Sequence, residues 1–440
     1  MPSKTTTKPT LEPMNNEQAL SMMRSVAAEQ EDSDYLQRIP EVAQAGLDRV
    51  QTLIATNLDV MTEFMKLVGR IAMTFFANQT YFNDLRGLKR GRMYTGESAL
   101  EYIVNAVKGY DFDPEKAQQN MTNYAKPDIR SLIHARNFNM QYKTTVFRDD
   151  VARAVVSENG IYEITQQVIN SLGYSGNFDE YLAMKHVILN VIEQGLGLSV
   201  VIPAPTTEDA SRQMLAAIKA WGKKLTYPST KYNPQGYAGL VTNTQTENLV
   251  LITTPEYDAY LDVYGLAPLF HLDVANIEYS KIIVDDFGAH DNVTGILVDR
   301  NALMFLENYW EMETWYNREG RFFNHWLTIS EVLSYSLFRN CIIFQTSASN
   351  VTGITVSPAK VTMVKGEKRR FTATVQGEGV IPQSVTWTLS GQAKDGTKID
   401  NYSGELTVAE DETASTLTVT AHSTLADVSE TGTATVTVTD

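Results

Sequence analysis

The amino-acid composition changes abruptly at about Ser347. Residues 348–440 hold nineteen threonines, one methionine and three aromatic residues. Apolar residues and threonines alternate there in short runs such as Val385–Leu389, and a period of two is typical of strands that bury one face. Turn residues separate these runs at intervals of roughly ten residues. We therefore predict that residues 351–440 fold as a separate all-β domain with Trp387 in its core.

The number of strands and the central tryptophan favour an immunoglobulin-like sandwich for this domain, without the cysteine pair of antibody domains. The chain has one cysteine, Cys341, within an apolar run. This excludes a disulfide framework and a zinc site of several cysteines, and it favours a cytosolic origin.

Residues 17–346 show a different, mixed pattern. Residues 1–16 contain three prolines and almost no apolar residues, so we predict a flexible N-terminal arm. Apolar residues then recur at helical spacing from Glu17 to about Phe76. A polar excursion broken by glycines follows over about 83–131, and we expect it to protrude and to contain one short helix, Ser98–Val107. Residues 161–194 predict two consecutive helices with a glycine-containing break at 173–176.

Strands and helices alternate in the centre of the chain, which predicts an α+β or α/β core. The predicted elements are strands at Leu198–Ile202, Leu249–Thr253, Lys281–Val284 and Gly295–Val298, and a helix at Glu208–Trp221 that Thr206 or Thr207 caps. We expect the run from Phe322 to Phe344 to close the sheet of this domain.

The charge balance argues against a protein that binds nucleic acid over its whole surface. Lys and Arg total 37 against 52 Asp and Glu, which gives a formal net charge of −15, and phosphate binding needs positive charge. No apolar run approaches the ~18 residues of a membrane span, and the N-terminus has no apolar segment typical of an export signal. We expect no membrane contact.

Acidic residues give the main candidates for chemistry. The pairs Asp149–Asp150 and Asp285–Asp286 could supply metal ligands or a general acid and base, but adjacent carboxylates point to different faces. The cluster of Asp285, Asp286, His290 and Asp291 is more easily read as a polar loop than as the metal site of a hydrolase. No nucleotide-binding or nucleophile motif is present. We predict no enzymatic activity, no cofactor and no bound metal.

The densest positive patch is the run Arg86, Lys89, Arg90 and Arg92. It could bind nucleic acid locally. Because the rest of the chain is acidic, docking against an acidic neighbouring copy is the favoured interpretation, and these four residues are candidates for contacts between subunits. We expect charge reversal at Arg90 or Arg92 to reduce assembly and leave the subunit folded.

Several short sequence runs follow one another in a characteristic order. They are Leu132–Asn137 leading to Asp149–Asp150; Asp179–Tyr181, Met184–Lys185 and Gly195–Leu196; Lys224–Thr226 with Pro228; Leu261–Val263; Leu297–Asp299; Met312–Thr314 with Asn317 and Gly320; and Leu333–Asn340. This ordered set resembles the major capsid proteins of phi29-like podoviruses. The C-terminal domain resembles bacterial Ig-like group 2 (BIG2) modules in Val356–Pro358, Gly366, Trp387 and Gly404–Val408.

The resemblance implies an α+β HK97-type capsid fold with peripheral (P) and axial (A) domains, followed by the Ig-like sandwich. Residues 1–16 would be the N-arm and 17–346 the capsid domain. Within it the extended E-loop would span about 77–130, the spine helix region about 161–194 and the A domain about 200–300.

The function that the resemblance implies is self-assembly into pentamers and hexamers of an icosahedral or prolate head that encloses the double-stranded DNA of a tailed bacteriophage. The expected location is the virion capsid, after synthesis and assembly in the host cytoplasm. Expected partners are further copies of the chain, a scaffolding protein, a portal, weakly bound DNA and, as a further candidate, head-fibre proteins. The alternative is a bacterial surface adhesin that binds through its Ig-like module.

Overall fold

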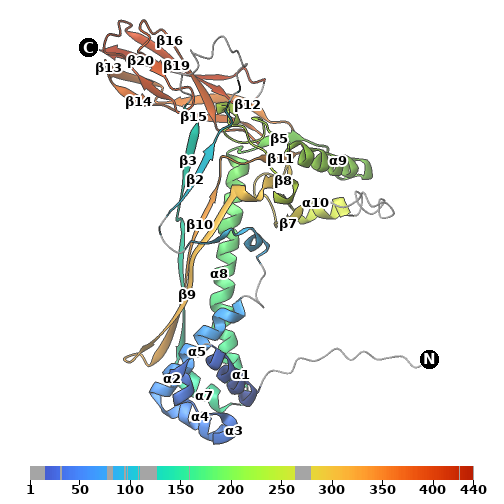
Figure 1. Cartoon of the computed structure of the whole chain (residues 1–440), viewed down its shortest axis with the longest axis vertical. Coiled ribbons are helices and arrows are strands. Elements are labelled where there is room, and N and C mark those ends of the chain that lie inside the picture. The colour runs from blue at the N-terminus through green and yellow to red at the C-terminus, as the bar shows by residue number, and fades with distance from the viewer. Residues whose placement is uncertain are drawn as a thin grey trace, which may run out of the picture.

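The computed structural model describes residues 15–439 except 30–31, 77–82, 94–95, 97, 108, 110–125, 158, 263–278 and 426. The molecule is elongated, with a helical bundle at one end and an all-β domain at the other (Figure 1). A long helix and a long sheet run between these ends, beside a second sheet.

The helical bundle is built from amphipathic segments whose apolar faces meet in one core, which includes Met23, Ile54, Phe64 and Val68. Its helices are α1 (Asn16–Glu29), α2 (Ser33–Arg38), α3 (Val42–Ala45), α4 (Leu47–Thr56), α5 (Leu58–Phe76) and α7 (Arg148–Val156). Asn16, the last residue of the predicted arm, is buried at the start of α1, where its Nδ2 donates to Val155 O at 3.0 Å. Residues 1–14 lie outside the described residues.

The long sheet has the strand order β1-β9-β10-β4. Its strands are β1 (Gly91–Arg92), β4 (Phe138–Phe147), β9 (Leu303–Asn317) and β10 (Phe322–Tyr335). β9 and β10 are antiparallel, with a register shift between Ser330 and Glu331.

One helix, α8 (Gly160–Glu193), packs against β10 and β4. The prediction of two helices with a break at 173–176 is wrong, because α8 continues through this segment for 34 residues in all. At Gly176 an added Cβ would lie 2.9 Å from Ile329 Cδ1, so the glycine lets the helix approach the sheet rather than ending it.

The second sheet has the order β5-β11-β8-β6-β7. Its strands are β5 (Leu198–Val201), β6 (Leu249–Thr253), β7 (Ser280–Ile283), β8 (Val293–Asp299) and β11 (Cys341–Gln345), and its helices are α9 (Glu208–Lys224) and α10 (Pro255–Tyr260). The central strands and helix predicted from sequence are confirmed, and Thr207 Oγ1 caps α9 by accepting from Ala210 N at 3.3 Å. The run Phe322–Phe344 is divided between the two sheets, as β10 and β11.

A two-stranded hairpin of β2 (Ser98–Val104) and β3 (Ile129–Ala135) lies beside these sheets (Figure 1). The predicted helix over Ser98–Val107 is wrong, since the exposure of side chains alternates residue by residue along β2. Short 3-10 segments connect other elements at Asp84–Leu88 (η1), Gly236–Ala238 (η3), Thr246–Asn248 (η4) and Arg300–Ala302 (η7).

The C-terminal domain is all-β, and Trp387 is buried in its core. Its strands are β12 (Asn350–Ser357), β13 (Lys360–Val364), β14 (Lys368–Arg370), β15 (Thr372–Glu378), β16 (Val385–Ser390), β17 (Lys398–Ile399), β18 (Glu405–Thr407), β19 (Thr416–Ser423) and β20 (Thr431–Thr439). The largest of its sheets has the order β13-β20-β19-β16. Its immunoglobulin-like classification stays a prediction.

Candidate assembly interface

The β2–β3 hairpin carries large apolar side chains on its outer face. These are Leu100, Tyr102 and Val104 of β2 and Ile129 and Ile133 of β3, with exposed fractions from 50% to 67%. Leu100 is paired with Ile133 and Val104 with Ile129, so the five side chains share one face, which we call the hairpin face. A contiguous exposed apolar patch of this kind marks an interaction surface.

The inner face of the hairpin is anchored to its own chain. His134 is only 2% exposed, and its Nδ1 lies 2.5 Å from Ser334 Oγ. Its Nε2 lies 3.3 Å from Glu101 Oε2, and Arg339 Nε lies 3.5 Å from Glu101 Oε1. Burial opposes ionisation of Glu101, but bonds from His134 and then Ser336, with the charge of Arg339, hold its pKa below the ordinary range.

The far end of the hairpin is held on the segment that contains η3. Asn105 Nδ2 donates to Gly239 O at 2.9 Å, and Arg130 Nη2 donates to Ala238 O at 2.7 Å. Because one face of the hairpin is fixed in this way, the hairpin face is presented in a defined orientation. Residues 110–125 of the predicted E-loop lie outside the described residues.

The basic run does not protrude as the sequence suggested. Leu85 and Leu88 are buried in the same core as residues of α8, which holds η1 against the body of the molecule. Arg86 Nε lies 2.6 Å from Glu180 Oε2. Lys89 Nζ lies 2.6 Å from Glu180 Oε1.

Two further carboxylates from the long sheet complete this group, which we call the ion cluster: Arg86, Lys89, Glu180, Glu307 and Glu331. Lys89 Nζ lies 2.5 Å from Glu331 Oε1 and 3.6 Å from Glu307 Oε2. The Glu180 and Glu331 side chains have no exposed surface. The cluster therefore joins η1, α8, β9 and β10 by charge pairs.

Burial and neighbouring charges shift the pKa values of Glu331 and Lys89. Burial and then the Glu180 carboxylate raise the pKa of Glu331 to about 7, against the opposing effect of Lys89. For Lys89, burial favours the neutral form, but the carboxylates of Glu331 and Glu180 outweigh it and raise its pKa. The ionisation of Glu331 and that of Lys89 therefore depend on each other.

The other two residues of the basic run, Arg90 and Arg92, are exposed. Arg90 Nη1 donates to Asn301 O at 3.5 Å and lies 2.6 Å from Met304 Sδ. Arg92 Nη2 lies 2.7 Å from Glu307 Oε1, with its side chain 50% exposed.

Several of these positions were missed by sequence reasoning. The acidic partners Glu180, Glu307 and Glu331 are distant in sequence from the basic run, so no local pattern connects them. The hairpin face did carry a signal, because Leu100, Tyr102 and Val104 alternate with other residues as in a strand.

The acidic pairs form ion pairs with basic side chains. Lys185 Nζ lies 2.7 Å from Asp285 Oδ1 and 2.9 Å from Asp286 Oδ2. Asp149 pairs with Arg321, and Asp150 pairs with Arg153. Among the described residues, no group of three or more His, Cys, Asp or Glu side chains is placed to hold a metal ion. The helices within the described part are also too short or too polar to cross a membrane.

Comparison with solved structures defines the class of fold. The chain is similar to a chain in the capsid structure of Staphylococcus phage Andhra, with a TM-score of 0.50, 15% identity and coverage of 62% of this chain and 86% of that chain. A chain in a structure of the head fiber and inner core protein of bacteriophage P68 gives a TM-score of 0.50 at 14% identity, with 60% and 85% covered. The fold is that of the HK97-type phage capsid proteins.

Sequence comparison then identifies the family. The pattern of the Phi29-like phage major capsid protein family matches residues 23–345. The major capsid protein of Bacillus phage PZA is 28% identical over 377 residues, which cover 85% of this chain and 84% of that protein. The corresponding protein of Bacillus phage B103 is 29% identical over 381 residues, with the same coverage. The chain belongs to the phi29-like phage major capsid proteins, and its location is the virion capsid.

Proposed function

We propose that copies of this chain associate into pentamers and hexamers of an icosahedral or prolate shell, with the hairpin face of each copy packed on a neighbouring copy. The observation that carries this proposal is the set of five apolar side chains left exposed on an otherwise anchored hairpin. Burying apolar surface contributes about 25 cal/mol per Å², and repetition in a closed shell multiplies each contact.

In this proposal the parts of the capsid domain have the roles expected for the fold. Residues 1–16 correspond to the N-arm and 17–346 to the capsid domain. The E-loop of about 77–130 contains β2 and the first residues of β3, α8 is the spine helix, and about 200–300 form the A domain.

The basic run has two proposed roles. Arg86 and Lys89 hold the base of the hairpin segment on α8 through the ion cluster, which sets the position from which the hairpin reaches a neighbour. Arg90 and Arg92 lie at the exposed end of the run, where they would contact acidic side chains of another copy. Each exposed pair contributes only about 0.2–1 kcal/mol, so these contacts act through their number.

The other proposed partners are a scaffolding protein, a portal and head-fibre proteins, together with the enclosed double-stranded DNA. The net charge of −15 supports weak, non-specific contact with DNA. We assign the chain a structural role without catalysis. The family assignment favours this role over a surface adhesin for the chain as a whole.

The C-terminal domain, proposed to be Ig-like and of the BIG2 group, would decorate the shell and strengthen it rather than bind host polymers. Its attachment supports this role: Gln383 N donates to Gln194 O at 3.1 Å, and Val380 is buried among core residues of the capsid domain. A domain held in this way moves with the shell to which it is attached.

The test is a charge placed on the hairpin face. Ile133→Asp should leave the subunit folded, because Ile133 is 67% exposed, and should abolish closed particles on expression together with the neighbouring viral genes. Circular dichroism would report folding, and electron microscopy with sedimentation would report particles. The matched control is Thr433→Asp on an exposed position of β20.

The basic residues are tested separately. A double variant, Arg90→Glu with Arg92→Glu, should reduce particle yield without changing the melting temperature of the subunit by more than a few degrees. Normal particle yield from Ile133→Asp would refute the role of the hairpin face, and normal yield from the double variant would refute that of Arg90 and Arg92.

A further inference from the structure

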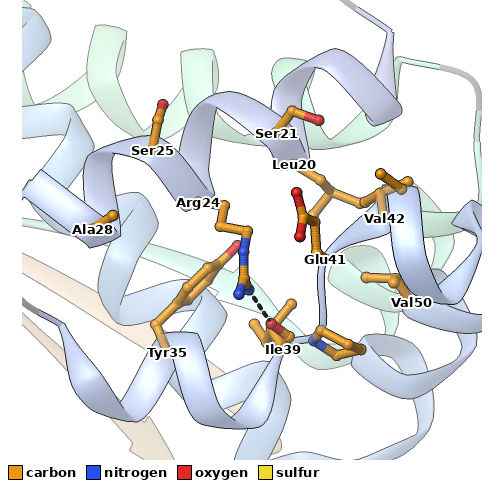
Figure 2. Close-up of a pocket in the computed structure, with 12 residues that line it drawn as sticks. Leu20, Ser21, Arg24, Ser25, Ala28, Tyr35, Ile39, Glu41, Val42 and Val50 are labelled. Atoms are coloured by element: carbon orange, nitrogen blue, oxygen red, sulfur yellow. Dashed lines mark hydrogen bonds between the residues drawn. The ribbon is translucent and has the colours of Figure 1, made fainter.

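A cavity of about 310 Å³ opens into the helical bundle between α1 and the segment from α2 to α4 (Figure 2). Its wall combines apolar and polar side chains: Leu20, Ile39 and Val50 with Arg24, Tyr35 and Glu41. This volume lies at the lower end of the range for binding sites of small ligands. The helical bundle, whose residues line the cavity, lies at the opposite end of α8 from the C-terminal domain (Figure 1).

The cavity contains a buried hydroxyl group that lacks a partner. Tyr35 is 1% exposed, and within the described part of the chain its hydroxyl makes no hydrogen bond. Leaving such a buried group unsatisfied is unfavourable. Figure 2 shows this hydroxyl beside the side chain of Arg24. An occupant that bonds to the hydroxyl would recover this cost.

Arg24 and Glu41 offer opposite charges to an occupant. Arg24 Nη1 donates to Ile39 O at 2.7 Å, and a guanidinium group has five N–H donors in all. Glu41 Oε2 accepts from Gln44 Nε2 at 2.9 Å. Arg24 and Glu41, both in the described part, form no ion pair within 4.0 Å. The cavity therefore suits a peptide segment that carries an acid, an apolar side chain and a base.

The sequence before α1 carries this combination. Glu12 follows Leu11 directly, and Lys8 precedes them by a few residues. The fourteen residues before Asn15 could span about 48 Å if extended. They lead directly into α1, whose residues Leu20 and Arg24 line the cavity.

We propose that the segment Lys8–Met14 binds in this cavity. The carboxylate of Glu12 pairs with Arg24 and accepts from the Tyr35 hydroxyl, Leu11 contacts the apolar wall, and Lys8 pairs with Glu41. The segment belongs to the same chain, because it leads directly into α1, whose residues Leu20 and Arg24 line the cavity.

Disulfide trapping in the full-length chain tests this proposal. Cys341 is buried, so it does not compete with introduced thiols. Thr10→Cys combined with Ser21→Cys on the cavity rim should form a disulfide under mild oxidation at least several-fold faster than Ser3→Cys combined with Ser21→Cys. The expected product is a disulfide within a monomer. A disulfide-linked dimer from a mixture of the two single variants would overturn the assignment of the segment to the same chain.

The contacts are tested by three changes. Glu12→Gln and Tyr35→Phe should each slow disulfide formation between the cysteines at positions 10 and 21 several-fold. The charge exchange of Glu12→Arg with Arg24→Glu should keep the rate near that of the chain without these changes. Arg38→Gln, at an exposed position of α2, is the matched control and should have no effect. Tyr35→Phe keeps the test valid if changes at Arg24 unfold the bundle, because it removes only the unpaired hydroxyl.

Equal trapping rates at positions 3 and 10, no trapping at either, or a rate at Thr10 that Glu12→Gln leaves unchanged would each overturn the proposal. The readout depends on the arm and the cavity alone, so it is independent of whether particles form.

Discussion

Glu331 has no exposed surface and lies near two other carboxylates, Glu180 and Glu307. Taking such groups out of water is costly unless positive charges compensate. Lys89 reaches all three of them, and Arg86 adds a bond to Glu180 and lies with its guanidinium carbon 4.2 Å from the centre of the Trp310 ring. The sequence predicted a role for these basic residues but placed their acidic partners in another copy.

The raised pKa of Glu331 predicts that the stability of the protein depends on pH. The pKa of Glu331 is raised from its ordinary value of 4.5 to about 7. Between these values the unfolded chain loses the proton while the folded chain keeps it, so Glu331 lowers the free energy of unfolding as pH rises through this range. Glu331→Gln removes this effect. The free energy of unfolding of the variant minus that of the wild type should therefore increase from about pH 4.5 to about pH 7. Above about pH 7 this difference should stay constant.

Urea denaturation at closely spaced pH values would measure this difference. Glu311→Gln, at an exposed position of β9, is the matched control. If the difference in free energy of unfolding between Glu331→Gln and wild type does not vary with pH, the pKa of the Glu331 carboxyl is not raised.

Among the elements, α8 shows how far local sequence can predict structure. Apolar spacing correctly predicted helix on both sides of Gly173–Gly176. The glycines suggested a break because glycine costs up to about 1 kcal/mol in a helix. That local cost is outweighed by tertiary packing, since Gly176 lies against Leu327 and Ile329 of β10. A local pattern contains no information about which strand the helix will contact.

The second prediction follows from this close approach. An added Cβ at Gly176 would lie 2.9 Å from Ile329 Cδ1 and 3.1 Å from Leu327 Cδ2. Gly176→Val should therefore lower the free energy of unfolding by about 1–3 kcal/mol, as overpacked core substitutions do. Ser171→Val, on the exposed side of α8, introduces the same side chain and should have a much smaller effect. Equal effects of the two variants in thermal denaturation would contradict the packing argument.

The β2–β3 hairpin shows a different limit of prediction from local sequence. The alternation of Leu100, Tyr102 and Val104 is typical of a strand, yet its exposed apolar positions fit neither a buried strand nor a solvated loop. A subunit that is completed by its neighbours places apolar residues where a monomer would place polar ones. The predicted strands of the second sheet were confirmed, and the apolar runs of its central strands β6 and β8 are buried within the chain itself.

The whole molecule combines two domains whose compositions differ sharply and whose surfaces nevertheless fit. Gly195 has φ +56, and an added Cβ there would lie 2.5 Å from Pro382 N, so the end of α8 meets the C-terminal domain in close contact. Gln345 Oε1 accepts from Val380 N at 3.2 Å, and Gln345 Nε2 donates to Ser349 Oγ at 2.9 Å. The boundary near Ser347 was predicted from composition, whereas this docking was not, because it depends on single residues distant in sequence.

The third prediction tests this docking. Val380 is 1% exposed and packs with core residues of the capsid domain, although it belongs to the C-terminal domain. Val380→Asp would bury an unpaired charge there, which is strongly unfavourable. The C-terminal domain should detach and stay folded, because its own core is formed by other residues, such as Trp387 and Leu417.

Limited proteolysis should then cut the Val380→Asp variant between Thr346 and Asn350 at least tenfold faster than wild type and release an intact C-terminal fragment. Val364→Asp makes the same chemical change in the same domain, but Val364 is 49% exposed, so its cleavage rate should match that of wild type. Equal rates for all three proteins would mean that the linking segment is protected without Val380. A released fragment that is itself degraded would mean that the C-terminal domain depends on the capsid domain for its stability.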